Sequence, residues 1–309
     1  MTVRVRPIAP ADVAPVARLL AARHATERRA EPLLPAGPAD DGRARALVEA
    51  TLAWRGAVGR VAEIDGVVAG LLVVAPALAG PGRPPATFVA ATAHAATDSA
   101  ALAALLAAWD DAGERHVQVG VHDAAGNAAV AAVGFEPLLD VGVARLPLAL
   151  GDRAPGLAIR QAGAEDLEAV LGLAAMLRAE HASLGVPDAG AERARQRVRL
   201  ADLRTGVWLA LVDGVALGMV VLQPPGTVVS PLHAPADAIH VPDLVVAPAA
   251  RGRGVAAALL AEALGWAGAI GYRHVTLHVH AGNVAAARFW RARGVRVVAR
   301  QWRRDQCPR

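Results

Sequence analysis

The same series of short sequence motifs occurs twice along this chain, in the same order. Residues 5–13 match residues 159–167, each as a short strand, a turn and a helix that opens on an acidic residue. Residues 61–70 match residues 209–218, each as two apolar runs on either side of Asp-Gly. Because a repeat of this period marks a duplicated structural unit, any fold assigned to the chain must be built twice.

Each copy carries a strong hairpin signal, at Asp65-Gly66 and at Asp213-Gly214. Glycine tolerates the positive φ that a type I′ turn requires, and Asp-Gly between alternating apolar runs is typical of a two-residue hairpin loop. We therefore expect a β-hairpin in each copy.

The later part of each copy repeats as well. An Ala-rich helix is predicted near residues 100–109 and near residues 255–266, and each leads into an apolar strand. An Asn, a short helix and a Gly then follow, at Asn127 and Gly134 in the first copy and at Asn283 and Gly294 in the second. Strands combined with a βαβ unit predict an α/β fold (an α+β mixed sheet) with helices on both faces.

The duplication divides the chain into two domains, a first copy at residues 1–150 and a second copy at residues 157–309, joined by a linker at residues 151–156. The 309 residues suffice for two domains of about 150 residues, each with its own core. In a right-handed crossover the N-terminus of the Ala-rich helix faces the C-terminal end of the preceding strand, so we expect ligands at that edge.

Composition excludes several classes of partner. The formal net charge is +4, aromatic residues make up 3%, and the arginines are scattered, which argues against nucleic acid. No apolar stretch of about 18 residues lacks charged and turn residues, so no membrane span is expected. The N-terminus enters a strand-like segment without a signal-peptide pattern, and the one cysteine, Cys307, excludes an internal disulfide, so we expect a cytoplasmic protein, either a monomer or a homodimer.

The most informative segment is residues 240–256. A predicted strand ends at Val246, and a helix then begins with two glycines and small residues. Free backbone N–H groups and the helix dipole favour an anion there, and Arg251 and Arg253 add positive charge, so the segment predicts a phosphate cradle. It lacks the Lys-Ser/Thr of a nucleotidase phosphate loop, which argues against a magnesium-bound triphosphate.

In these residues the sequence resembles the GNAT superfamily of N-acetyltransferases. The three defining positions of the family's helix-start motif are held by Arg251, Gly254 and Ala256, and residues 246–248 supply the preceding V-x-P. The family's later motif is matched by Leu277, Asn283, Ala286, Trp290 and Gly294-Val295. The resemblance covers residues 157–305, and it implies two tandem GNAT domains with acetyl-CoA as cosubstrate.

The resemblance also implies roles for particular residues. The backbone of Leu244, Val245 and Val246 would bond the pantetheine arm, Asn283 would contact the coenzyme near that arm, and Trp290 would lie beside the thiol. The pyrophosphate would be held by the N–H groups of Gly252, Arg253, Gly254, Val255, Ala256 and Ala257, with Arg251 preceding them. The reaction implied is direct attack of a primary amine on the acetyl thioester.

The resemblance also points to two positions at which acid and base chemistry would be expected. His240 stands where many family members place a general base, and imidazole accepts a proton near neutral pH. Trp290 stands where the usual general acid is Tyr, and an indole N–H cannot deliver a proton. The following strand places His274, Thr276, His278 and His280 on one face, without a third metal ligand at suitable spacing. Asp243 is a possible contact for the amine, although strand alternation directs it away from His240.

The first copy lacks the glycine cradle, because residues 94–99 contain no Gly and Asp98 precedes the helix. We expect a degenerate domain there, with the Pro-rich and charged residues 28–41 as a mobile flap. Two alternatives remain: a non-catalytic acyl-CoA-binding module, and a relative of mycothiol synthase, which is similar in its tandem layout. The amine acceptor, a small molecule or a peptide, is not identified by the sequence.

Overall fold

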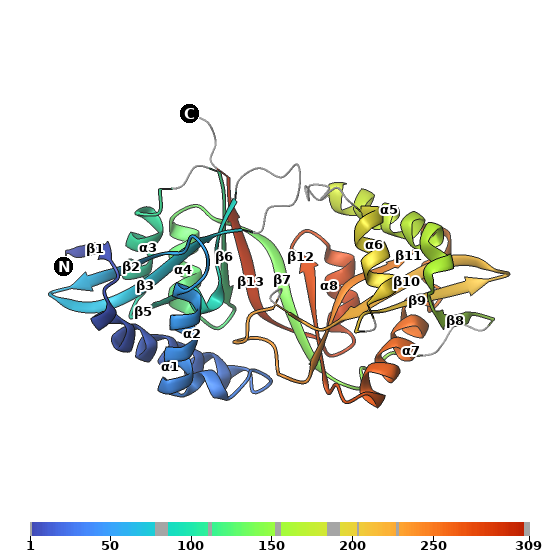
Figure 1. Ribbon diagram of the computed structural model, residues 1–309, viewed down its shortest axis with the longest axis horizontal. Coiled ribbons are helices and arrows are strands. Elements are labelled where there is room, and N and C mark those ends of the chain that lie inside the picture. The colour runs from blue at the N-terminus through green and yellow to red at the C-terminus, as the bar shows by residue number, and fades with distance from the viewer. Residues whose placement is uncertain are drawn as a thin grey trace.

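The computed structural model describes residues 2–77, 86–110, 113–151, 156–183, 192–202, 204–226 and 229–305 (Figure 1). Cys307 and residues 152–155 of the predicted linker lie outside this description. The predicted domain boundary therefore stays a prediction, and we keep the names first copy and second copy for the parts on either side of it.

The two copies contain the same elements in nearly the same order. The strands of the first copy are β1 Val3–Pro7, β2 Val58–Ile64, β3 Val67–Pro76, β4 Ala86–Val89, β5 His94–Ala96, β6 Glu114–Gly120 and β7 Glu136–Arg145, and its helices are α1 Val13–Ala30, α2 Asp41–Leu52, α3 Ser99–Ala107 and α4 Ala124–Ala132. The strands of the second copy are β8 Ala158–Gln161, β9 Gly206–Val212, β10 Val215–Gln223, β11 Ala238–Val246, β12 His274–His280 and β13 Arg296–Arg304, and its helices are α5 Leu167–Ser183, α6 Glu192–Ala201, α7 Val255–Ala269 and α8 Val284–Arg291. Short 3-10 turns at Pro10–Asp12, Gly37–Ala39, Ala91–Ala93, Ala164–Asp166 and Pro248–Ala250 complete the description.

Local chemistry forms these elements in the same way in both copies. The hairpin turns have positive φ at both central residues, 51° and 79° at Asp65 and Gly66 and 48° and 78° at Asp213 and Gly214, as a type I′ turn requires. The predicted hairpins are thus confirmed.

The entry to the first long helix of each copy is also the same. Arg6 donates to Asp12 at 2.6 Å, and Arg160 donates to Asp166 at 2.7 Å, so that the first strand is tied to the helix start. The arginine hydrogen bond holds the pKa of each carboxyl below its ordinary value.

The described strands form one mixed sheet rather than two separate ones. Its order is β1-β2-β3-β4-β6-β13-β7-β12-β11-β10-β9-β8, with β5 paired to β3. The last strand of each copy therefore lies in the sheet of the other: β7 pairs with β12, and β13 pairs with β6. Figure 1 shows β7 and β13 side by side at the centre of the molecule. This strand exchange has no signal in the repeat pattern.

Close packing at the centre depends on particular residues of β7. A side chain on Gly142 would bring its Cβ within 2.6 Å of Val295, so only glycine fits there. Val141 and Val143 are buried, and Arg300 of β13 donates to Asp140 at 2.7 Å across the strand pair. The exchange is thus stabilised by both apolar burial and an ion pair.

Helices cover both faces of the sheet, as predicted. In the second copy α7 packs on one face, against Val220 and Ile239, while α5 packs on the other, against Met219 and Val245. In the first copy α3 contacts β2 and β3, and α1 contacts β3 and β5. Among the described residues, no helix is both long and apolar enough to cross a membrane.

The segment predicted to be a mobile flap, residues 28–41, is instead packed against the rest of the chain. Leu34 is 2% exposed and lies with Val141 and Val298 in an apolar cluster on the exchanged strands. The carboxylate of Glu31 pairs with Arg296, and His24 hydrogen-bonds the Pro35 carbonyl at 2.7 Å. Composition was misleading here because a few buried residues suffice to anchor a polar segment.

Truncation of Leu34 tests this packing. We expect Leu34→Ala to lower the free energy of unfolding by about 3 kcal/mol, because it leaves a cavity against the central strands. The measurement is urea unfolding, with Val67→Ala as the control, since Val67 is 69% exposed. A loss for Leu34→Ala no larger than that of the control would show that residues 28–41 are not held in place.

Candidate functional site

A β-bulge in β11 sets the direction of its side chains. Val221 of β10 pairs with Asp243, whereas Gln223 pairs with His240, so β11 has one extra residue between these pairs. His240 and Asp243 consequently lie on the same face of the sheet, the face covered by α5. The expectation from simple alternation, that Asp243 points away from His240, is wrong because the bulge reverses the alternation.

The same strand separates from its parallel neighbour just beyond the bulge. Pairing of β11 with β12 ends at Val241 and Leu277, while β11 continues to Val246 beside β10. Between the diverging strands lies a cleft of about 720 Å³. Its described lining is Leu139, Leu177, Glu180, His181, Val241, Pro242, Leu244, Val245, Val246, Ala250, Arg251, Gly252, Gly254, Val255, Ala256, Ala257, Leu277, His278, Val279, His280, Asn283, Ala285, Ala286, Phe289, Trp290 and Arg293.

One end of the cleft is the N-terminus of α7. Gly252 and Gly254 have φ of 74° and 77°, and Gly254 caps the helix without a side chain. The first intrahelical bond of this turn runs from the Ala258 N–H to the Gly254 carbonyl, which leaves the preceding amides of the helix without intrahelical acceptors. A Cβ on Gly252 would meet nothing within 4 Å. The backbone amides at this turn are therefore open to a ligand.

Arg251 lines the cleft, and its side chain is held by two neighbours. Its Nε donates to the Val246 carbonyl at 3.0 Å, and its guanidinium pairs with Glu180 of α5. Arg251 thus fastens the glycine loop to the strand end and to α5. Arg253 is exposed and lies outside the described lining of the cleft.

His240 lies behind the wall of the cleft. It is 1% exposed, and its Nδ1 shares a 3.1 Å hydrogen bond with the Thr276 hydroxyl. The ring of His278, which does line the cleft, stands edge-on to it at 5.1 Å between centroids. Burial lowers the pKa of His240 to about 3 and that of His278 to about 4. Both imidazoles are therefore neutral near pH 7.

The remaining polar residues share this face. Alternation along β12 places Thr276, His278 and His280 together, as predicted, and His274 pairs with Asp237 at 2.7 Å. Asp243 pairs with Arg199 of α6, so its carboxylate is already neutralised. In the described part of the chain, no group of three or more His, Cys, Asp or Glu is placed to hold a metal ion.

Trp290 is 6% exposed and borders the cleft beside Phe289, whose ring is edge-on at 5.2 Å. Arg293 lies over Phe289 at 3.5 Å from the ring centroid, and its Nε is buried without a hydrogen-bond partner among the described residues. A guanidinium N–H that lacks a partner can contact an anionic ligand.

Sequence reasoning missed the walls contributed by distant elements. Leu177, Glu180 and His181 come from α5, and Leu139 comes from β7 of the first copy. The amphipathic pattern of α5 is a weak sequence signal that its residues could line a cleft. No sequence signal existed for Leu139, because it reaches the cleft only through strand exchange.

The first copy shows what happens to the same place without a glycine cradle. Asp98 caps α3 by accepting a 2.9 Å hydrogen bond from the Ala101 N–H, as expected from the sequence. The structural counterpart of Asn283 is Asp123, since each caps the short helix after the central strand. The sequence match of Asn283 to Asn127 is therefore wrong.

Four charged or imidazole side chains of the first copy stand at positions that line the cleft in the second. The matched positions are Arg23 and Leu177, Glu27 and His181, His94 and Leu244, and Asp123 and Asn283. Arg23 lies 3.3 Å from Glu27, 3.8 Å from Asp123 and 2.9 Å from the Nδ1 of His94. These buried groups fill the space that is open in the second copy.

A loop of the second copy closes this cluster from the other side. Leu232 is fully buried in the main core of the first copy, and the ring of His233 lies 4.0 Å from the Glu27 carboxylate. Burial lowers the pKa of His233 to about 3 and raises that of Glu27. That the first copy lacks an anion site stays a prediction.

Comparisons with known proteins fit this geometry. Residues 173–295 match the model of the acetyltransferase (GNAT) family. A GCN5-related N-acetyltransferase structure from Sphaerobacter thermophilus is 19% identical with a TM-score of 0.62, over 99% of this chain and 96% of that one. A comparison with curated proteins gave no match.

Two further structures share the whole fold. A tandem GNAT protein from the clavulanic acid biosynthesis pathway is 16% identical with a TM-score of 0.51, over 100% of both chains. A GNAT-family acetyltransferase from Colwellia psychrerythraea is 13% identical with a TM-score of 0.52, over 97% of this chain and 98% of that one. These likenesses establish a tandem GNAT fold across the full length.

The buried imidazoles make stability depend on pH. Burial holds the pKa of His240 and His278 below the unfolded value of about 6.5, so the unfolded chain takes up protons first as the pH falls. Between pH 7 and pH 5 the free energy of unfolding should drop by up to about 2 kcal/mol per histidine. Urea unfolding across this range should show a weaker dependence for a His240→Gln, His278→Gln double variant.

The control for this comparison is His122→Gln, because His122 is exposed. It should keep the pH dependence of the wild type. A double variant with the same pH dependence as the wild type would show that these two rings are not kept neutral by burial.

Proposed function

We propose, from the acetyltransferase (GNAT) family domain in residues 173–295, that this chain transfers the acetyl group of acetyl-CoA to a primary amine. The observation that carries the proposal is the cleft between β11 and β12 that ends at the glycine cradle of α7. A long, flexible ligand with an anionic centre matches a cleft that is apolar between the strands and rich in free amides at one end.

The residues present fit the coenzyme. The open backbone from Gly252 to Ala257 would hold the pyrophosphate. The edge of β11 at Leu244, Val245 and Val246, which is not paired with β12, would bond the pantetheine arm. Asn283 lies on the same cleft, although its side chain also caps α8 by accepting from the Ala286 N–H at 2.9 Å. When bound, acetyl-CoA supplies an acetyl group activated as a thioester.

The imidazole pair would take the proton of the acceptor amine. His278 borders the cleft, and His240 stands behind it, held by Thr276. As the amine nitrogen forms its new bond its N–H becomes more acidic, so a neutral imidazole with a low pKa suffices as the acceptor. In this proposal His278 receives the proton, and His240 orients the ring of His278.

No described residue replaces the usual Tyr at Trp290. The leaving thiolate would depart unprotonated, which is feasible because a thiol has a modest pKa of about 8.5. Trp290 would instead wall the thiol end of the cleft and exclude water.

The charge of the cleft bears on the acceptor. Among the described lining residues the one carboxylate is Glu180, and it pairs with Arg251. A polycation would find little to bind there, so we propose a small acceptor with one reactive amine.

Acetyl-CoA binding is tested by placing a carboxylate in the cradle. Ala256→Glu should weaken acetyl-CoA binding at least about 100-fold, because placing like charges side by side costs several kcal/mol. The fold should survive, since a carboxylate is favourable at a helix N-terminus. Ala100→Glu is the matched control, because Ala100 is likewise the second residue of its helix, α3. Equal acetyl-CoA affinity in both variants, measured by calorimetry, would show that the cradle is not part of the binding site.

Catalysis is tested by release of free CoA with a panel of primary amines. His278→Ala and His240→Ala should each lower kcat/KM by about 100-fold or more while leaving acetyl-CoA affinity unchanged. The exposed His122→Ala serves as the control. Full activity of His278→Ala would contradict the proposed role. Tight acetyl-CoA binding by the wild type without turnover of any amine would favour the acyl-CoA-binding module.

A further inference from the structure

The two copies differ at one matched place beneath the Ala-rich helix. In the second copy the indole of Trp208 packs on Trp266 at 5.0 Å between ring centroids. It also covers Gly206, where an added Cβ would lie 2.0 Å from the Trp208 ring. The space between α7 and the sheet is thus filled by an indole that the chain itself supplies.

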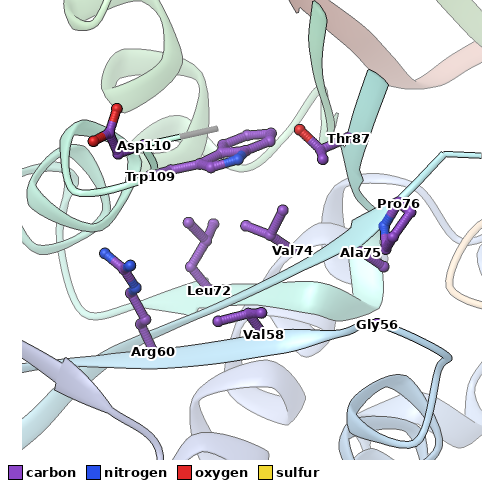
Figure 2. Close-up of a pocket in the computed structure, with 10 residues that line it drawn as sticks. All are labelled: Gly56, Val58, Arg60, Leu72, Val74, Ala75, Pro76, Thr87, Trp109 and Asp110. Carbon is purple, nitrogen blue, oxygen red and sulfur yellow. The ribbon is translucent and has the colours of Figure 1, made fainter. Parts of the chain in front are cut away.

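In the first copy the same place is open. Counted back from the Asp-Gly turns, Val58 and Arg60 stand where Gly206 and Trp208 stand in the second copy. A pocket of about 240 Å³ results, lined by Gly56, Val58, Arg60, Leu72, Val74, Ala75, Pro76, Thr87, Trp109 and Asp110 (Figure 2). The cleft assigned to acetyl-CoA is in the second copy, and the two share no lining residue.

The walls of this pocket suit a flat apolar ring. Figure 2 shows Trp109 on one side, with Leu72 and Val74 facing it from the sheet. Trp109 is 3% exposed, stacks on Phe135 at 6.2 Å and has the Arg115 guanidinium 5.7 Å from its ring centre. The aromatic wall is therefore held in place before any ligand arrives.

One polar atom on the pocket lining has no hydrogen-bond partner among the described residues. The Thr87 hydroxyl is buried and makes no hydrogen bond with any residue that the structure describes. A buried hydroxyl without a partner is destabilising, so a ligand that supplies one gains affinity at this point. Arg60 donates to the Ala108 carbonyl, and both Arg60 and Asp110 belong to the pocket lining. The two charges have opposite sign, which favours a neutral ligand.

We propose that this pocket binds a neutral planar aromatic molecule of about the size of indole, with a ring N–H directed to the Thr87 hydroxyl. The molecule would take the place that Trp208 takes in the second copy. The site is independent of the proposed acetyl transfer, and its test does not use acetyl-CoA.

The probe is indole, titrated into the full chain by calorimetry. A ligand this small should bind with a Kd of about 1 mM or tighter. Val58→Gly together with Arg60→Trp copies the second copy, so the chain fills its own pocket and indole binding should disappear. Thr87→Val should weaken binding about five-fold, because it removes one neutral hydrogen bond. Val215→Ala, at an exposed position of the second copy, should bind like the wild type.

Thermal unfolding shows whether the double variant is folded, and NMR provides a readout that does not depend on it. In the wild type, indole protons should give nuclear Overhauser effects to the methyl groups of Leu72 and Val74. Failure of the wild type to bind indole at millimolar concentration would overturn the proposal, and so would unchanged binding by a folded double variant. Overhauser effects to methyl groups elsewhere would also overturn it.

Discussion

The pairing of β7 with β13 is the interaction on which the rest of the structure depends. These strands lie at the centre of the sheet between the two copies, and each completes the sheet of the other copy. Gly142 lets the chain approach closely at this point, and the apolar cluster with Leu34 covers it. Through the same pairing, Leu139 of the first copy becomes part of the cleft in the second. The cleft is therefore a product of the whole chain.

The two copies have the same backbone fold, and a few side chains determine which spaces are open in each copy. At the diverging strands, Arg23, Glu27 and Asp123 fill in the first copy what remains open in the second. Beneath the Ala-rich helix the relation is reversed, because Trp208 closes in the second copy what Arg60 leaves open in the first. The second copy has an open cleft between the diverging strands, and the first copy has an open pocket beneath the Ala-rich helix.

Sequence reasoning recovered the features that depend on local pattern. The Asp-Gly turns, the Ala-rich helices and the glycine loop were predictable because each is determined by residues close in the sequence. The bulge at β11 was not, so the direction of Asp243 was wrong. Strand exchange could not be predicted from the sequence either. The apolar alternation of β7 and β13 would be the same in the sheet of either copy. The burial of His240 and the anchoring of residues 28–41 follow from those long-range contacts.

Strand exchange has a consequence for how such a chain can be divided. If the polypeptide were cut between β7 and β8, each fragment would keep a strand that belongs in the other fragment's sheet. Each would also have an unpaired sheet edge where its partner's strand should lie, an arrangement prone to association. The two fragments are thus complementary pieces, and recombining them would restore the continuous sheet as a two-chain complex with the same cleft.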